Sequence, residues 1–353
     1  MSTRAARRAL LLVALAFACF PLSACAGEAS FEHGVVGVRL SDRVGEYSAW
    51  SPDGRWIAEP ARIGFRLRNV ETGKQRELKA PAYQGFPERP GRLDWSGDGK
   101  TIRYATSLPR PENGNASWLT EAPLDGSGYR HQTLGVRAQR VSWAADGYPL
   151  AFSTGPYALD FEKGPIGPQP ALYVVDEFGA TPRRVAYIPH PKREEEIGEP
   201  AVSPDGTRVA YQRWGAHHNV NIWIVESDGS DPRSLVPGLV SAFTVEWAPD
   251  GRTLALGAYT AKGDRRQHVY TVPTGGGRLR RIVDEEILDG PTWSPDGRWL
   301  AYSTYDGKIW RVHPDGSRRQ LIGETPGEEP RSLLWSPDGR HLAYTADPPT
   351  RET

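Results

Sequence analysis

The chain has 353 residues, of which 38% are hydrophobic and 24% charged, a balance that excludes a disordered chain and a polytopic membrane protein. The formal net charge is zero, and it becomes −3 once the three arginines of residues 1–24 are set aside, which disfavours a nucleic-acid-binding protein. Tryptophan, glycine and proline are abundant, with 12, 38 and 31 residues, a mixture typical of aromatic strands joined by many turns.

Residues 1–24 have the features of a secretory signal peptide. A basic start that ends at Arg8 precedes an uncharged apolar run from Ala9 to Phe20. Twelve apolar residues are too few for a membrane-spanning helix, which needs about 20. The sequence Leu-Ser-Ala-Cys follows at positions 22–25, and it is similar to the lipobox of bacterial lipoproteins.

The lipobox resemblance implies that cleavage occurs before Cys25 and that its thiol carries a diacylglycerol. Two acyl chains anchor a protein stably in a membrane, so the mature protein is expected on the extracytoplasmic side of the bacterial cell membrane. Residues 25–33 then form a lipidated tether. The alternative is a secreted protein whose cleavage site happens to contain a cysteine. Cys19 lies in the leader, so no cysteine remains for a disulfide or a thiolate metal site.

One motif recurs seven times after the leader. It consists of an aromatic or apolar residue, a turn such as Ser-Pro-Asp-Gly and an alternating apolar run. The turn sequence predicts a β-hairpin, because proline presets a type I turn and glycine accepts the left-handed position after it. The intervals between copies are 45, 48, 59, 45, 46 and 42 residues, close to the 40–45 residues of a propeller blade. The copies begin at Trp50, Trp95, Trp143, Val202, Trp247, Trp293 and Trp335.

A second hairpin follows each of the first six motifs, and two hairpins make one four-stranded antiparallel blade. The pattern resembles the TolB-like and WD-repeat-like β-propellers of bacterial periplasmic and surface proteins. It predicts an all-β propeller over residues 34–347, with seven four-stranded blades and a tail at residues 348–353; six blades are the alternative. The seventh motif lacks a second hairpin, so the strand-like run at residues 35–40 is expected to close the last blade.

Other interpretations of these motifs are less favoured. The repeated aspartates fit turn formation better than calcium binding or catalysis, and the repeated tryptophans fit packing between blades. The sequence contains no Gly-x-Ser-x-Gly elbow, P-loop, dinucleotide fingerprint or His-Glu-x-x-His motif. We therefore predict no catalytic residue, no cofactor and no metal site. The pair His217 and His218 is expected to be solvated.

The unusually long connections of this chain are expected on one face. If the strands of each blade are labelled A to D from the axis outward, the short motif turns lie on one face and the B–C and D–A connections on the other. Loops on a rigid scaffold commonly carry binding residues, so the face with long loops is the candidate binding face. Its loops are residues 107–117, 155–170, 187–200, 214–221 and 260–267. Its candidate residues are Trp118, Tyr157, Phe161, Lys163, His190, Lys192, Trp214, His217, His218, Lys262 and Arg265.

Two classes of function remain. The favoured class is a monomeric, non-enzymatic binding or protein-interaction scaffold at the cell envelope, with an envelope protein or glycan as its partner. The alternative is a propeller enzyme, a lyase or glycan hydrolase, with acids converging on the axial channel; Glu46, Glu199, Glu246 and Asp289 lie near such positions. A Tol-system role is not expected, because TolB carries an additional N-terminal domain and only a short tether precedes the first blade of this chain.

Overall fold

The computed structural model describes residues 29–348, with the exception of short gaps. The gaps are residues 41–46, 62–63, 80–81, 84–85, 88–89, 108–116, 146, 156–157, 161–163, 167–168, 190, 192–194, 216–219, 240 and 261–265. The predicted leader, Cys25 and most of the tail therefore lie outside the described residues. Within the described part, no helix is long and apolar enough to cross a membrane.

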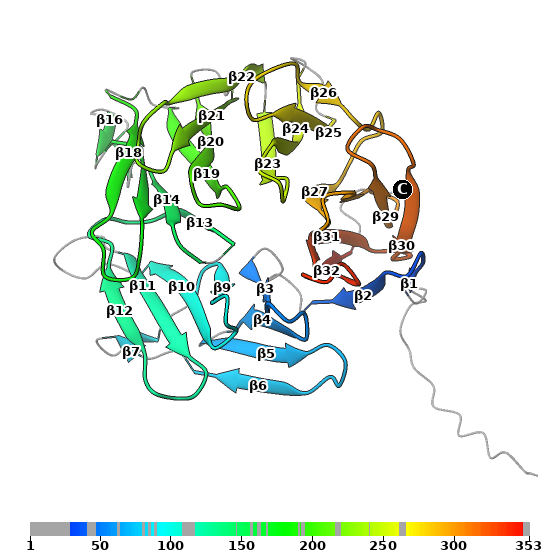
Figure 1. The fold of residues 1–353 in the computed structure, drawn as a ribbon, viewed down its shortest axis with the longest axis horizontal. Coiled ribbons are helices and arrows are strands. Elements are labelled where there is room, and N and C mark those ends of the chain that lie inside the picture. Colours follow the sequence, from blue (N-terminus) through cyan, green and yellow to red (C-terminus); the bar gives the residue numbers. More distant parts are fainter. Residues whose placement is uncertain are drawn as a thin grey trace, which may run out of the picture.

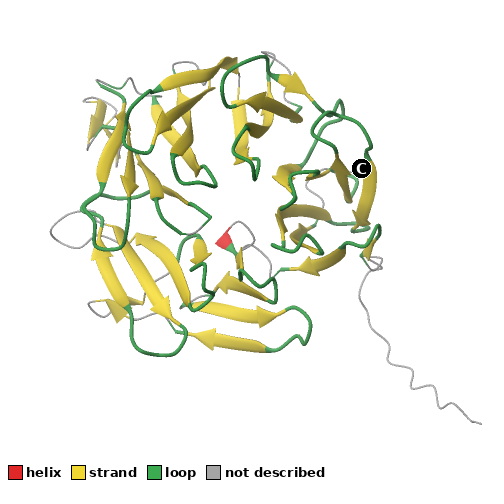
Figure 2. Ribbon diagram, viewed as in Figure 1, coloured by secondary structure: helices red, strands yellow, loops and turns green. Residues whose placement is uncertain are grey.

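Seven β-sheets stand in a ring around a common axis (Figure 1). Strands and loops make up almost all of the described chain (Figure 2). The prediction of a seven-bladed propeller is therefore confirmed, and the six-bladed alternative is wrong.

The first three blades each contain four antiparallel strands, which follow one another from axis to rim. Blade one consists of β3 (Ala49–Trp50), β4 (Trp56–Pro60), β5 (Phe65–Asn69) and β6 (Gln75–Leu78). Blade two consists of β9 (Leu93–Trp95), β10 (Thr101–Ser107), β11 (Ser117–Pro123) and β12 (Arg130–Thr133). Blade three consists of β13 (Arg140–Trp143), β14 (Leu150–Thr154), β17 (Ala171–Val175) and β18 (Arg183–Tyr187).

The next three blades repeat this arrangement, and blade six gains an additional outer strand. Blade four consists of β19 (Glu196–Val202), β20 (Arg208–Trp214), β21 (Val220–Glu226) and β22 (Arg233–Leu239). Blade five consists of β23 (Ser241–Trp247), β24 (Thr253–Tyr259), β25 (His268–Pro273) and β26 (Arg280–Arg281). Blade six consists of β27 (Asp289–Trp293), β28 (Leu300–Ser303), β29 (Lys308–Val312), β30 (Gln320–Glu324) and the added strand β1 (Ser30–Phe31).

Blade seven differs from the predicted four-stranded form. It contains three strands, β31 (Glu329–Trp335), β32 (His341–Asp347) and the N-terminal β2 (Val36–Arg39). The expected closure by the N-terminal run is confirmed, but β2 pairs in parallel with β32, whereas neighbouring strands in the other blades are antiparallel. The N-terminal segment cannot supply a fourth strand to this blade, because β1 pairs with β30 of blade six instead.

The motif turn is held by its own side chains. In the first copy, Ser51 Oγ donates to Asp53 Oδ1 at 2.5 Å, and the backbone N–H of Arg55 donates to the same oxygen at 3.0 Å. Gly54 follows the aspartate with a φ of 69°, in the left-handed region that favours glycine. Corresponding Ser–Asp bonds form at Asp98, Asp205, Asp296 and Asp338. The assignment of these aspartates to turns is thus confirmed.

Four of the motif tryptophans, Trp50, Trp95, Trp247 and Trp293, donate to a backbone carbonyl of the preceding blade in the ring. Trp95 is 5% exposed, and its Nε1 donates to the Ala49 carbonyl of blade one at 3.0 Å. Trp247 donates to the Ala201 carbonyl at 2.8 Å in the same way. Because an indole combines a large apolar area with one donor, it both fills the space between two blades and fixes their spacing. The predicted packing role is confirmed at both positions.

The hydrophobic core is divided among the junctions between blades. One cluster joins Phe65 and Leu67 of blade one to Leu93, Ile102 and Tyr104 of blade two. Another cluster spans the end of the ring and brings Val35 from the N-terminal segment against strands of blades six and seven. The stability of each blade therefore depends on its neighbours, as in other repeat folds.

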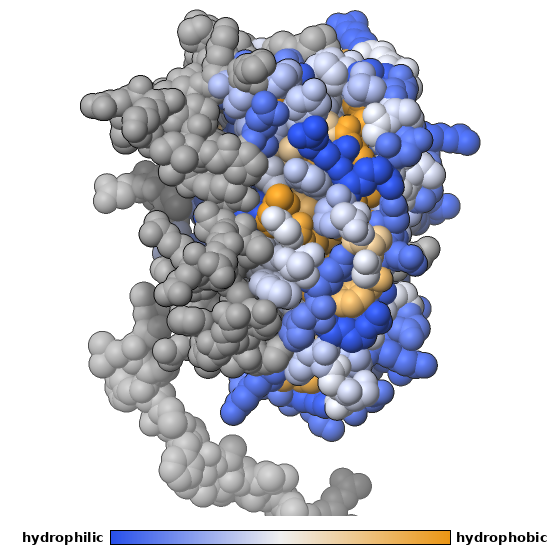
Figure 3. Space-filling view, turned by 90° about the vertical axis from the view of Figure 1, so that its left-hand side faces the viewer, coloured by the Kyte–Doolittle hydropathy of each residue, from blue (hydrophilic) through white to orange (hydrophobic). Residues whose placement is uncertain are grey.

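Two small hairpins lie in the connections of the long-loop face within the described residues, one at an expected position and one not. The B–C connection of blade three contains a small hairpin, β15 (Ala158–Asp160) with β16 (Gly164–Ile166). A second hairpin, β7 (Ala82–Tyr83) with β8 (Phe86–Pro87), lies in the D–A connection between blades one and two, where no long loop was expected. Seen from the side, the described surface is largely hydrophilic and carries small, separate apolar patches (Figure 3).

Candidate functional site

A cavity of about 610 Å³ lies on the propeller axis. Its wall is built from the innermost strands or the residues before them in all blades, and Gln267, Glu286 and Tyr305 extend it toward the long-loop face. The charged residues of the wall carry both signs. They are Arg92, Arg140, Arg331, Glu199, Glu246, Glu286 and Asp289.

One ion pair connects two blades that are not neighbours in the ring. Arg92 Nη1, from the segment before β9 of blade two, lies 3.7 Å from Glu199 Oε1 in β19 of blade four. The side chains remain 45% and 39% exposed. An exposed pair of this length contributes little to stability, commonly about 0–1 kcal/mol, so both charges can be engaged by a bound molecule at small cost.

Two acids in the wall have unusual protonation behaviour. Burial raises the pKa of Glu246 to about 7, although Thr292 Oγ1 donates to its Oε1 at 3.1 Å. Burial also raises the pKa of Asp289, whose Oδ2 accepts the backbone N–H of Leu333 at 3.2 Å. Both carboxyls are within hydrogen-bonding distance of protein donors, and the charge of the wall at Glu246 changes near neutral pH.

An aromatic side chain also faces this cavity. Phe243 lies in β23, where the pairing with β24 is interrupted by a bulge between Ala242 and Thr244. Its side chain is 49% exposed, and its ring lies 5.5 Å from that of Tyr259. A bulge redirects side chains that would otherwise alternate regularly, and at this position it leaves a large apolar group in contact with solvent.

The structure brings together three of the four acids that the sequence placed near the axis. Glu199, Glu246 and Asp289 all line the cavity, and Glu46 lies outside the described residues. The arginines of the wall were missed. A positional signal could have found Arg92 and Arg140, because the residue three positions before the start of motifs two to seven lines the cavity. This position is occupied by Arg92, Arg140, Glu199, Thr244, Gly290 and Ser332 in blades two to seven.

Only two residues of the predicted binding face can be placed. Trp118 lies in β11, half-buried between Thr106 and Thr133 of the adjacent strands. Trp214 ends β20, where it pairs with Glu196 and packs against the core shared by blades four and five. The remaining residues lie outside the described part, namely Tyr157, Phe161, Lys163, His190, Lys192, His217, His218, Lys262 and Arg265. Among the described residues, no three His, Cys, Asp or Glu side chains are grouped so that they could hold a metal ion.

Known proteins resemble this chain in sequence over short stretches. It is 35% identical over 93 residues to the uncharacterized peptidase YuxL of Bacillus subtilis, a match covering 25% of this chain and 14% of that protein. It is 30% identical over 96 residues to the Tol-Pal system protein TolB of Methylococcus capsulatus, covering 26% of this chain and 22% of TolB. The chain thus matches less than a quarter of the length of either relative.

The fold as a whole is shared with solved structures. The oligogalacturonate lyase of Vibrio parahaemolyticus superposes with a TM-score of 0.60 over 84% of both chains, at 14% identity, a likeness of fold alone. The family of the TolB beta propeller domain matches residues 165–353, more than half of the sequence. With the motif turns and the ring of seven blades, this match shows that the chain belongs to the TolB beta propeller domain family.

Proposed function

We propose that the chain is a non-enzymatic binding protein of the bacterial cell envelope, held to the membrane by lipid on Cys25. Its partner is a segment of an envelope protein that enters the mouth of the axial cavity from the long-loop face. The observation that carries this proposal is the cavity wall, which combines exposed charges of both signs with the half-exposed Phe243.

This wall suits a polypeptide segment. A bound segment can place an apolar side chain on Phe243 while its charged side chains engage Arg92 and Glu199. Protein interfaces depend on a few such aromatic and arginine anchors surrounded by polar groups. The acids of the wall support binding better than catalysis, because Glu199 is paired with an arginine and Asp289 accepts a backbone N–H. The likeness to TolB supports a role in the cell envelope.

The proposal is tested by capture and then by substitution. The full chain, purified in detergent, is used to capture proteins from an envelope extract, and the captured partner is identified by mass spectrometry. The Kd of the purified pair is then measured for Arg92→Ala and Phe243→Ala. We expect each substitution to raise the Kd about tenfold or more, because loss of an interface anchor costs about 2 kcal/mol.

Two substitutions away from the axial cavity serve as matched controls. Arg298→Ala removes an exposed arginine from the motif turn of blade six, on the opposite face. Tyr187→Ala removes a 47% exposed aromatic ring from β18, the outermost strand of blade three, which tests whether binding extends from the axial cavity to the edge of the long-loop face. Both variants should bind with the Kd of the unmodified chain. A partner that tolerates Arg92→Ala and Phe243→Ala but is lost with Arg298→Ala would show that the motif-turn face is the binding surface.

The lipid anchor is tested separately at Cys25. Cys25→Ser removes the thiol that the acyl chains would modify, so we expect the protein to leave the membrane fraction or to accumulate with its leader uncleaved. Cell fractionation and the mass of the mature N-terminus measure these outcomes. A variant that is cleaved normally and stays in the membrane fraction would contradict lipid anchoring without affecting the axial binding proposal.

A further inference from the structure

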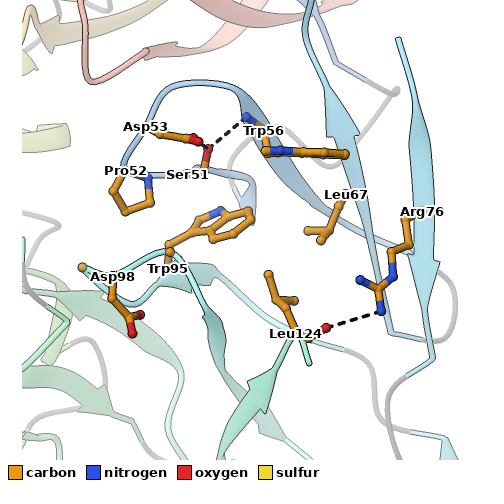
Figure 4. Close-up of a pocket in the computed structure, with 11 residues that line it drawn as sticks. Ser51, Pro52, Asp53, Trp56, Leu67, Arg76, Trp95, Asp98 and Leu124 are labelled. Atoms are coloured by element: carbon orange, nitrogen blue, oxygen red, sulfur yellow. Dashed lines mark hydrogen bonds between the residues drawn. The ribbon is translucent and has the colours of Figure 1, made fainter. Parts of the chain in front are cut away.

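A second pocket, of about 540 Å³, lies between blades one and two on the face of the motif turns. We call it the inter-blade pocket. The indoles of Trp56 and Trp95 form two of its walls, and Leu67 and Leu124 line it beside them (Figure 4). Its volume is within the range of sites for small ligands, about 300–1,000 Å³.

At the corresponding junction between blades four and five, an arginine, Arg208, fills the space between the blades. Trp56 and Arg208 correspond, because each lies six residues after the start of its motif, at Trp50 and Val202. Strand register agrees, since both residues begin the second strand of their blade and pair with the last residue of the third strand. Trp56 therefore occupies the position from which an arginine extends between blades elsewhere in this molecule.

Arg208 shows what this junction binds. Its guanidinium lies 4.9 Å from the centre of the Trp247 ring, and its Nη2 donates to the Gly251 carbonyl at 2.8 Å. Its Nη1 donates to Thr274 Oγ1 at 3.3 Å. The guanidinium thus combines a cation–π contact with hydrogen bonds to the turn of the next blade.

Most of this binding environment is present in the inter-blade pocket, but no arginine extends into it from the position of Trp56. Trp95 corresponds to Trp247, Gly99 to Gly251, and Leu124 to Thr274 by their places in blades two and five. The aromatic wall and the turn carbonyl are therefore retained. The hydroxyl group is replaced by the aliphatic side chain of Leu124.

Two other aromatic rings near blade junctions are also covered by arginine. Arg103 of blade two lies 5.0 Å from the ring centre of Tyr148 in blade three. Arg311 lies 4.3 Å from that of Trp299, the tryptophan of blade six that corresponds to Trp56. Leu67 in blade one corresponds to Arg311 in blade six. Leu67 pairs with Ala58 and Arg311 with Ala301, and these two alanines occupy the same position in their motifs. The pocket remains open because blade one has a shorter, uncharged side chain at this position.

The charge of the pocket favours a cation beside the motif turns of blades one and two. Asp53 and Asp98 line the pocket there, and hydrogen bonds from the Ser96 hydroxyl and the Lys100 backbone hold the pKa of Asp98 below its usual value. Arg76 is the one basic side chain among the lining residues, and it lies on the other side of the Trp95 indole from Asp98 (Figure 4). Its Nη2 is directed to the Leu124 carbonyl at 3.4 Å, away from the aspartates.

We infer that the inter-blade pocket binds a guanidinium group on an alkyl stem, with the guanidinium against Trp95 and close to Asp98, as Arg208 lies against Trp247. The group is supplied by a free guanidine compound or by an arginine side chain of a peptide. This site is on the opposite face from the axial cavity and does not depend on the function proposed for that cavity.

The inference is tested with arginine and its neutral isostere. The full chain in detergent is titrated calorimetrically with the capped tripeptide Ala-Arg-Ala, the same peptide with citrulline, and agmatine. Citrulline has nearly the same shape but no charge, so we expect it to bind at least tenfold more weakly than arginine. A peptide source predicts that Ala-Arg-Ala binds more tightly than agmatine, and a free guanidine source predicts the reverse order. Equal binding of the arginine and citrulline peptides would overturn the inference.

Variants locate the site. Trp56→Arg and Leu67→Arg each place an internal guanidinium in the pocket, as in blades four and six, so both should abolish binding of Ala-Arg-Ala while the melting temperature shows that they fold. Trp299→Ala in blade six and Glu177→Ala in an exposed turn of blade three should leave binding unchanged. If a folded Trp56→Arg or Leu67→Arg variant binds the peptide as the unmodified chain does, the inter-blade pocket is not the site.

Discussion

Glu246 shows how a single side chain couples the axial cavity to stability. Its carboxyl is part of the cavity wall and accepts a hydrogen bond from Thr292, and burial raises its pKa from 4.5 to about 7. Between these two values the folded protein keeps a proton that the unfolded chain has lost. The contribution of Glu246 to the free energy of unfolding is therefore greatest at low pH and declines as the pH rises from 4.5 to 7.

The first prediction concerns Glu246→Gln. The amide is neutral at every pH and keeps an oxygen that can accept the bond from Thr292, so the variant avoids the cost of a buried charge. We expect its free energy of unfolding, relative to the unmodified chain, to increase by about 1–3 kcal/mol between pH 4.5 and pH 8, since one pKa unit corresponds to about 1.4 kcal/mol. Urea denaturation at the two pH values measures this difference.

A control substitution separates this effect from the general loss of a negative charge. Glu71→Gln removes the same charge from an exposed turn of blade one, so its effect on stability should differ much less between the two pH values than that of Glu246→Gln. An unchanged difference between Glu246→Gln and the unmodified chain across this range would mean that the Glu246 carboxyl titrates as it does in water.

The sequence anticipates residues whose role repeats and misses those whose role depends on local volume. Asp53 and Trp95 were assigned correctly, because the same turn and the same packing position recur in other blades. The inter-blade pocket was not anticipated. It arises from the particular volumes of Trp56 and Leu67 in one blade relative to Arg208 and Arg311 in others. Motif spacing matches Trp56 with Arg208, but Leu67 can be matched with Arg311 only when the strand register is known.

At the scale of the element, β2 could be predicted as a strand but not in its pairing. The run at residues 35–40 has strand character, and the missing hairpin of motif seven requires an additional strand. Neither feature specifies the parallel direction or the separate pairing of β1 with blade six. The side chain of Phe31 in β1 contacts both strands of this region, because its ring lies over the backbone of β2 at Gly37 and 5.5 Å from the ring of Tyr344 in β32.

The second prediction follows from this contact. A Cβ atom at Gly37 would lie 2.0 Å from the Phe31 ring, so Gly37→Ala must displace either the ring or the strand. Overpacking of this kind costs about 1–3 kcal/mol, and we expect the melting temperature to fall by a few degrees. Differential scanning calorimetry measures the change.

Two comparisons identify the cause of that loss. Gly275→Ala introduces a methyl group where no atom lies within 4 Å, and it should leave the melting temperature unchanged. In a Phe31→Ala background, Gly37→Ala should cost much less, because the clashing ring is gone. An equal cost in both backgrounds would place the strain elsewhere in β2.

At the scale of the whole molecule, the two ends of the described chain meet. β2 pairs with β32 near the C-terminus (Figure 1). The guanidinium of Arg39 forms two hydrogen bonds of 2.8 Å with the Glu328 carboxylate from the connection between blades six and seven. Val35 and Phe31 contribute to the core cluster that unites blades six and seven. The last junction of the ring therefore cannot form until both ends of the propeller are present.

The last prediction is that the ring fails without its N-terminal segment. Deletion of residues 31–41 leaves β32 as an unpaired edge and uncovers the core around Leu342, so we expect a large fall in melting temperature and self-association. Calorimetry and size-exclusion chromatography measure both. A synthetic peptide of residues 29–41 should restore the melting temperature, because strand addition needs only a free edge and an exposed apolar site. If the deletion melts at the original temperature, blade seven is stable without β2, and closure by the N-terminal strand has no energetic role.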